Sequence, residues 1–362
     1  MKIVIFGLTI SSSWGNGHAT IWRGLCRALI KRGHHIVFFE RDVPYYSSHR
    51  DLTELPGTEI ILYTDVEKMI VLANYHLYEA DTAIVTSYCP DGMTASDLIL
   101  KSFAGFKVFY DLDTPVTIKD LKAGKHVPYL PAAGLGEFDL VLSYTGGPAL
   151  LELKNLLGAR QALPLYGSAD PDYHKPAALE EVYRSDFSYL GTYAEDRQDE
   201  LLDLFIEPAK LLRGKKFLIG GSLYPPNFPW SENIYFIDHV APPEHSKFYS
   251  SSGFTLNITR GAMAAMGYCP SGRLFEAALC EVPVISDYFK GLENFFELDK
   301  EIIIVQSTGE VVKALNLSPA SRKEIAQNAR QRVLKEHTSW HRAVEFENII
   351  NSLKKVANKE IK

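Results

Sequence analysis

The stretch that decides the fold spans residues 254–287 and reads FTLNITRGAMAAMGYCPSGRLFEAALCEVPVISD. Residues 254–258 and 282–286 are short apolar runs with β-branched side chains, which predicts two strands. Between them, the small residues at 259–272 predict a loop. Residues 273–280 predict a short helix with Ser271 in the capping position. A strand–loop–helix–strand unit of this kind is typical of a parallel α/β sheet.

The same stretch predicts a nucleotide site. The loop ends at a helix N-terminus, where free N–H groups and the helix dipole favour an anion. Arg260 and Arg273 flank the loop, and guanidinium groups bind phosphate well. Glu276 lies one turn into the helix, where its carboxylate can accept the two hydroxyls of a ribose. The alternative is that Arg273 and Glu276, spaced i and i+3, form only a surface ion pair.

Length and composition favour a two-domain globular protein. The chain has 362 residues, 46% of them hydrophobic and 23% charged, with a net charge of −6. This balance gives no general attraction to nucleic acid or to membranes. The four cysteines form no CxxC pair, the N-terminus lacks a signal peptide and no apolar run reaches membrane-spanning length. We therefore expect a cytoplasmic protein without a membrane span.

Strands and helices alternate along the whole chain. Expected strands of the first half occupy residues 2–7, 35–40, 59–63, 82–86, 107–110 and 140–143, and those of the second half 187–190, 217–219, 234–237, 254–258, 282–286 and 302–305. Helical patterns separate them, which predicts two doubly wound, Rossmann-like parallel sheets in an α/β protein. Ligands of such sheets bind beyond the carboxyl ends of the strands.

The loop after the first strand contains Gly15 and Asn16, and the second strand ends at Glu40. This arrangement is similar to a dinucleotide fingerprint, which would indicate an NAD-dependent oxidoreductase. However, about seven residues separate the first strand from Gly15, whereas the fingerprint glycine follows its strand directly. A mobile glycine loop beside a substrate cleft explains the pattern better.

Several acid–base candidates follow the strands of the first half. Asp111 and Asp113 form an Asp-x-Asp pair, which is either a metal–diphosphate site or a turn with helix-capping aspartates. His18 stands at a helix start, where it either caps the helix or contacts substrate. His337 and His341 have the i, i+4 spacing of a zinc helix but no evident third ligand. We expect no bound metal.

Turn-rich residues 164–176 mark the junction between the two halves. We expect one Rossmann-like domain at residues 1–165, a second at 166–336 and a C-terminal helical segment at 337–362.

At this point the sequence resembles a known family. The matching segments are residues 12–20 (SSWGNGHAT), 39–44 (FERDVP), 110–115 (YDLDTP), 143–148 (SYTGGP), 165–168 (LYGS), 190–193 (LGTY) and 273–277 (RLFEA). They are similar to those of the CgeB-like (spore maturation protein) glycosyltransferases, within the two-domain GT-B superfamily. The resemblance covers most of the chain.

The resemblance implies that the second domain, residues 166–336, holds a nucleotide-sugar donor in an interdomain cleft. It also implies that the first domain, residues 1–165, holds the acceptor and that the C-terminal helix at 337–362 packs back onto the first domain. Glu276 matches the ribose-binding glutamate, Arg197 the basic residue that meets the diphosphate, and Val240 the position where backbone groups pair with the base. The full set of expected donor-binding residues is Gly15, Asn16, Gly191, Thr192, Tyr193, Arg197, Val240, Arg260, Ser271, Arg273, Leu274 and Glu276. Tyr268 replaces a second glutamate that many such enzymes carry, which leaves open whether the reaction retains or inverts the anomeric centre.

The predicted function is therefore a metal-independent glycosyltransferase (EC 2.4, hexosyl or pentosyl) without a cofactor. Its donor is a nucleotide-diphosphate sugar, and its acceptor is a metabolite, a glycan, a protein or a modified DNA base. Asp113 is the first candidate for the base of an inverting reaction, followed by Glu40 and His18. A nucleotide-sugar epimerase and a non-catalytic nucleotide-sugar-binding module remain alternatives.

Overall fold

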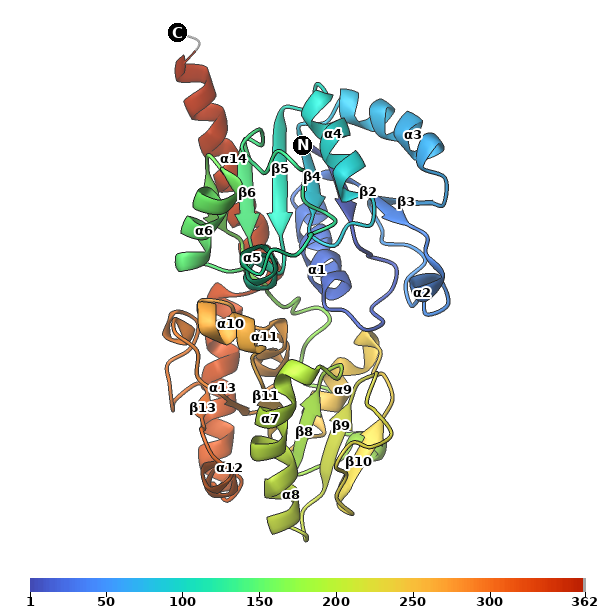
Figure 1. Ribbon diagram of the computed structural model, residues 1–362. Coiled ribbons are helices and arrows are strands. Elements are labelled where there is room, and N and C mark those ends of the chain that lie inside the picture. The colour runs from blue at the N-terminus through green and yellow to red at the C-terminus, as the bar shows by residue number, and fades with distance from the viewer. Residues whose placement is uncertain (361–362) are drawn as a thin grey trace. The chain divides into compact units, whose positions relative to one another are not determined.

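The computed structural model describes residues 1–360, and for 356–360 only the course of the backbone. It contains two compact α/β units (Figure 1). Unit 1 comprises Met1–Ser13, His18–Tyr166 and the chain from Ser339 onward. Unit 2 comprises Trp14–Gly17 and Gly167–Thr338.

Unit 1 is built on a seven-stranded sheet in which every neighbouring pair is parallel. The order is β3-β2-β1-β4-β5-β6-β7. The strands are β1 (Lys2–Gly7), β2 (His35–Arg41), β3 (Thr58–Tyr63), β4 (Thr82–Thr86), β5 (Phe106–Asp111), β6 (Leu140–Ser143) and β7 (Ala162–Pro164). The central strands are continuous apolar runs because helices cover both faces of such a sheet. In β1, for example, Ile3, Val4, Ile5 and Phe6 are completely buried.

The helices of unit 1 follow its strands along the chain. They are α1 (His18–Lys31), α2 (Pro44–Ser47), α3 (Val66–Tyr78), α4 (Gly92–Lys101), α5 (Thr114–Lys122), α6 (Pro148–Leu157) and α14 (Ser339–Glu360). Helix α14 packs against α1 although it ends the chain. Arg32 donates to both carboxylate oxygens of Glu347 at 2.7 and 2.6 Å, and His34 contacts the same carboxylate at 2.6 Å. These contacts fix α14 on unit 1.

Unit 2 repeats the plan with a six-stranded parallel sheet in the order β10-β9-β8-β11-β12-β13. Its strands are β8 (Phe187–Leu190), β9 (Phe217–Gly220), β10 (Ile234–Ile237), β11 (Thr255–Asn257), β12 (Val284–Ser286) and β13 (Ile303–Ile304). Its helices are α7 (Gln198–Leu201), α8 (Glu207–Leu211), α9 (His245–Ser250), α10 (Gly261–Met266), α11 (Gly272–Leu279), α12 (Thr308–Ala314) and α13 (Pro319–Glu336). A π-helical turn at Leu202–Ile206 joins α7 to α8.

The strand order places a switch point in each sheet. In unit 1 the chain leaves β1 toward β2 on one side and returns to β4 on the other, and in unit 2 the same reversal separates β8 from its neighbour β11. Because crossover connections diverge there, a crevice forms beyond the carboxyl ends of the two strands. The predicted donor residues Gly191 and Arg260 follow β8 and β11, so they lie at the switch point of unit 2.

The predicted fold class, two doubly wound parallel sheets, is confirmed, with local corrections. The stretch expected to be a loop between β11 and α11 contains helix α10, because its alanines and methionines are good helix formers. Helix α5 and the edge strand β7 were not predicted. Ser271 does occupy the N-cap of α11, but its side chain makes no capping hydrogen bond. Among the described residues, no helix is both long and apolar enough to cross a membrane.

Candidate functional site

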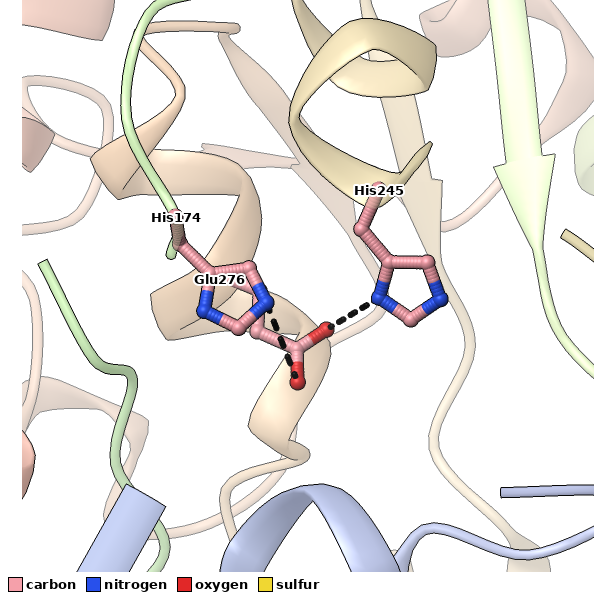
Figure 2. A group of neighbouring side chains, drawn as sticks. All are labelled: His174, His245 and Glu276. Atoms are coloured by element: carbon pink, nitrogen blue, oxygen red, sulfur yellow. Dashed lines mark ion pairs between the residues drawn. The ribbon is translucent and has the colours of Figure 1, made fainter. Parts of the chain in front are cut away.

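The centre of the candidate site in unit 2 is the carboxylate of Glu276 on helix α11. Only 9% of this residue is exposed, and two histidines from other segments flank it. Nε2 of His174 lies 4.0 Å from Oε1, and Nδ1 of His245 lies 3.6 Å from Oε2 (Figure 2). Both distances exceed those of hydrogen bonds, so the carboxylate oxygens keep acceptor capacity for hydroxyl donors.

Glu276 is ionised in this setting. Burial opposes its charge, but His174, His245 and Arg273 outweigh burial and hold the pKa of the carboxyl at about 2. Since the unperturbed carboxyl has a pKa of 4.5, its contribution to folding is complete above that value and is lost only as the pH falls toward 2. The protein therefore presents a full negative charge here throughout the neutral range.

Arg273, one turn before Glu276, ties α11 to the switch point. Its Nε donates to the carbonyl of Leu190 at the end of β8, and its Nη1 donates to Oδ1 of Asn257 at the end of β11, at 3.0 Å. The guanidinium also lies 5.2 Å from the ring centre of Tyr189. A guanidinium has five N–H donors and these contacts use two, so Arg273 can position the strands and still meet an anion.

The segment after β8 approaches this arginine closely. A Cβ on Gly191 would lie 2.8 Å from Oη of Tyr189 and 3.0 Å from Nη2 of Arg273, so a larger residue would displace the ends of these two side chains. Arg197 donates to the carbonyl of Thr192 at 2.7 Å. Glycine here lets a ligand approach the backbone beside two cationic side chains.

Other predicted donor residues lie around this point. Tyr193 packs edge-on against Tyr224, whose hydroxyl donates to the Gly191 carbonyl at 3.0 Å. Arg260 forms a partly exposed ion pair with Asp196 at 3.1 Å, and it directly precedes α10. These contacts order the loop on which Gly191 and Thr192 lie.

Leu274 lies in the core of unit 2. Its side chain is completely buried, and its N–H donates to the carbonyl of Ser271 at 3.1 Å. These contacts stabilise α11, and the assignment of Leu274 to donor binding stays a prediction.

Val240 is connected to the carboxylate through one of the histidines. Its carbonyl accepts a hydrogen bond from Nε2 of His245 at 3.1 Å. A carbonyl can only accept, so Nε2 carries its proton and Nδ1 is the atom that faces Glu276. Val240 itself is buried, with 4% exposed.

Two of the predicted acid–base residues meet in unit 1. His18, the first residue of α1, places Nε2 2.8 Å from Oδ2 of Asp113, which occupies the N-cap of α5. Asp113 makes no capping hydrogen bond with its side chain, so its carboxylate is committed to His18 and not to the helix. The ring of Tyr88 stands edge-on to His18 at 5.8 Å, and Tyr88 adopts the uncommon φ of 61°.

Glu40 holds the loop after β1. It is fully buried and accepts four hydrogen bonds from that loop. These come from the Thr9 hydroxyl at 2.9 Å, the amides of Ile10 and Ser11 at 2.7 and 3.0 Å, and the Ser11 hydroxyl at 2.6 Å. These contacts give its carboxylate a structural role, and its assignment to acid–base chemistry stays a prediction.

Gly15 and Asn16 lie further along that loop. Gly15 has a φ of 65°, which favours glycine, and the Asn16 side-chain amide donates to the carbonyl of Trp14 at 3.1 Å. Residues 14–17 belong to unit 2 by their contacts. Their assignment to donor binding stays a prediction.

The buried carboxyl of Asp111 should make the stability of the protein depend on pH. Burial raises the pKa of this fully buried carboxyl from 3.8 to about 6. The folded state therefore holds a proton that the unfolded state has released, and stability falls as the pH rises through this window, by roughly 3 kcal/mol in all. Asparagine does not titrate, so the free energy of unfolding of Asp111→Asn should not show this decrease. Urea unfolding should therefore show the stability of the variant rising relative to that of wild type between pH 4 and 7. A difference that does not change with pH would contradict this account.

The sequence analysis missed three residues of these sites: His174, His245 and Tyr88. The two histidines are far from Glu276 in sequence and follow no spacing rule. Tyr88 lay within a stretch expected beyond a strand end, but nothing indicated its left-handed backbone. One general rule could have pointed to the histidines. A buried carboxylate requires polar partners, and histidines near strand ends are candidates for that role.

His174, His245 and Glu276 also form the one group of metal-ligating side chains found among the described residues, with ligand atoms within 4.8 Å of one another. Two imidazoles and a carboxylate are a ligand set that zinc accepts. The expectation that the protein works without a metal is therefore still a prediction.

Comparison with known proteins identifies the fold. Residues 197–348 match the protein family described as glycosyl transferase-like. No curated protein matches the sequence. Among solved structures, sucrose-phosphate synthase from Thermosynechococcus elongatus is similar at a TM-score of 0.72 and 16% identity, over 98% of this chain and 99% of that one.

Two further structures align along nearly their whole length. Anabaena HepE, solved in complex with UDP and glucose, has a TM-score of 0.66 and 11% sequence identity, over 97% of this chain and 100% of that one. An α-glucosyltransferase solved in complex with UDP and DNA has a TM-score of 0.69 and 15% identity, also over 97% of this chain and 100% of that one. The chain thus has the two-domain GT-B fold.

Proposed function

We propose that the protein is a glycosyltransferase that moves a sugar from a nucleotide-diphosphate sugar to an acceptor hydroxyl. The observation that carries this proposal is the placement of Glu276 on α11. An ionised, almost buried carboxylate lies one turn from Arg273, which is bonded to the ends of both switch-point strands. A carboxylate for a diol beside cations for a diphosphate matches the two polar parts of a ribonucleoside diphosphate.

The neutralising groups on unit 2 favour a reaction without a bound metal. Arg197, Arg273 and the N-terminus of α11 can stabilise negative charge on a departing diphosphate, as oriented donors do in other active sites. Gly191 permits the backbone approach that such contacts need. On this proposal the protein needs no cofactor beyond the nucleotide sugar.

The acceptor is assigned to unit 1, where Asp113 and His18 form a pair. Nε2 of His18 donates to Asp113, which leaves the second carboxylate oxygen of Asp113 to take a proton from the acceptor hydroxyl. In a retaining reaction the donor phosphate takes that proton, and Asp113 binds the hydroxyl without deprotonating it. Tyr88 supplies an aromatic surface next to the pair, of the kind on which sugar rings pack.

The more specific assignments follow from the sequence motifs. Residues 110–115 and 165–168 support membership of the CgeB-like group. UDP and glucose occur in the complex of HepE, and DNA in that of the α-glucosyltransferase, so UDP-glucose is the first donor to test and modified DNA one of the acceptors. A cytoplasmic location agrees with four buried cysteines.

The test is a thermal-shift screen of purified protein against UDP, ADP, GDP and the corresponding nucleotide sugars, followed by sugar-transfer assays with the donor that binds. A ligand at 100 times its dissociation constant adds about 2.7 kcal/mol, which such a screen detects. Binding of one donor with transfer to an added acceptor is expected. Interconversion of the bound sugar without an acceptor would identify an epimerase, and binding without any turnover would identify a binding module.

A further inference from the structure

His245 contacts two parts of the candidate donor site at once. It is the first residue of α9, its Nε2 donates to the Val240 carbonyl at 3.1 Å, and its Nδ1 lies 3.6 Å from Oε2 of Glu276. Figure 2 shows the imidazole on one side of the carboxylate and that of His174 on the other. The carboxylate is therefore held between two rings that come from separate segments.

The Val240 contact decides which atom of His245 meets Glu276. Because Nε2 is anchored to a carbonyl, the ring cannot turn without losing that hydrogen bond, and Nδ1 stays directed at the carboxylate. Arg273, Tyr249 and Cys280 are the other titratable groups near Glu276. Burial raises the pKa of the Tyr249 hydroxyl and of the Cys280 thiol, so both are neutral and Arg273 is the charged one of the three. Among the groups around it, His245 is the one that connects Glu276 to the segment following β10.

We propose that His245 is a positioning residue that fixes Glu276 so that both of its oxygens accept the ribose hydroxyls, and that it thereby sets the preference for ribonucleotides over 2′-deoxyribonucleotides. This inference rests on the proposed function. A carboxylate discriminates between one and two hydroxyl donors only when its orientation is fixed. Nε2 of His174 lies 4.0 Å from the other oxygen.

The experiment compares His245→Gln, His245→Asn and wild type. The glutamine amide can reach the position of Nε2 and keep the Val240 contact, whereas the asparagine amide can take the position of Nδ1 beside Glu276. Dissociation constants are measured by calorimetry for UDP and 2′-deoxy-UDP, or for the ADP and GDP pairs if those bind better. Melting temperatures of the free proteins show whether each variant is folded.

In wild type the ribonucleotide should bind at least tenfold more tightly than its 2′-deoxy analogue. In His245→Gln the ribonucleotide constant should rise about tenfold while that of the 2′-deoxy analogue changes little, because only the second hydroxyl contact depends on the orientation. His245→Asn should retain part of the preference. Equal weakening of both ligands would overturn the inference, because a general structural role affects them alike.

Three other results would also decide against it. If Zn²⁺ raises the melting temperature of nucleotide-free wild type, and His245→Gln abolishes that shift, the three side chains form a metal site instead. If wild type binds none of the ribo- or deoxyribonucleoside diphosphates, the proposed donor site is itself wrong. Binding with an unchanged ribose preference in the variants overturns the positioning role alone.

Discussion

Glu276→Gln should weaken the binding of the donor nucleotide by about 100-fold, with a comparable loss in kcat/KM. Hydrogen bonds to a charged group contribute roughly 1.5–3 kcal/mol each, and the amide offers one acceptor oxygen where the carboxylate offers two. Losing one such contact and the charge on the other amounts to about 3 kcal/mol, or roughly two orders of magnitude in dissociation constant. Isothermal calorimetry with the bound nucleoside diphosphate measures the change directly.

The matched control is Glu324→Gln on α13. Glu324 is exposed, so the same chemical change should leave nucleotide binding and the melting temperature nearly unaffected. Because the pKa of Glu276 is about 2, the affinity of wild type should show no titration of this carboxyl between pH 5 and 8. A Glu276→Gln protein that binds nucleotide within twofold of wild type would remove the central observation of the proposed function.

The sequence predicted those features of this protein that depend on local pattern. Strand β1 and strand β8 have the bounds expected from their apolar runs, and α11 begins next to its predicted capping residue. Glu276 and Arg273 were assigned together because helix spacing and the preceding loop are visible in sequence. The wrong expectation of a loop at α10 arose because this six-residue helix is apolar on every side and too short to show a helical period.

What the sequence could not predict are contacts between segments far apart in the chain. Glu40 illustrates this point, because its place at a strand end indicated a ribose or acid–base role. In the structure its carboxylate instead accepts the hydrogen bonds of residues 9–11. His174 and His245 show the opposite case, in which residues of the candidate site were not predicted. Neither belongs to a motif, and only folding brings them to the carboxylate of Glu276.

If the reaction inverts the anomeric centre, Asp113→Asn should reduce kcat by 10²- to 10⁴-fold while leaving the dissociation constant of the donor nucleotide unchanged. This range is the usual contribution of a positioned general base, and the amide of asparagine cannot take a proton. Donor affinity should persist because the proposed donor contacts lie on residues of unit 2, whereas Asp113 belongs to unit 1. Single-turnover transfer assays at saturating donor separate the chemical step from binding.

His18 provides a second, graded variant of the same pair. His18→Ala removes the group that contacts Oδ2 of Asp113 at 2.8 Å, while His18→Gln can still donate a hydrogen bond to it. If His18 acts by orienting Asp113, glutamine should restore part of the rate that alanine loses. Asp97→Asn on α4 is the control, because Asp97 forms only an exposed pair with Lys101 and such pairs contribute at most about 1 kcal/mol.

The size of the Asp113 effect also bears on stereochemistry. An inverting transferase needs a base on the protein, so the loss should reach at least 10²-fold. In a retaining transferase the donor phosphate accepts the proton, and removal of Asp113 should cost about tenfold and raise the KM of the acceptor. The anomeric configuration of the product, determined by NMR, must agree with whichever loss is found. A large loss with a retained configuration would show that Asp113 acts on the sugar and not on the acceptor proton.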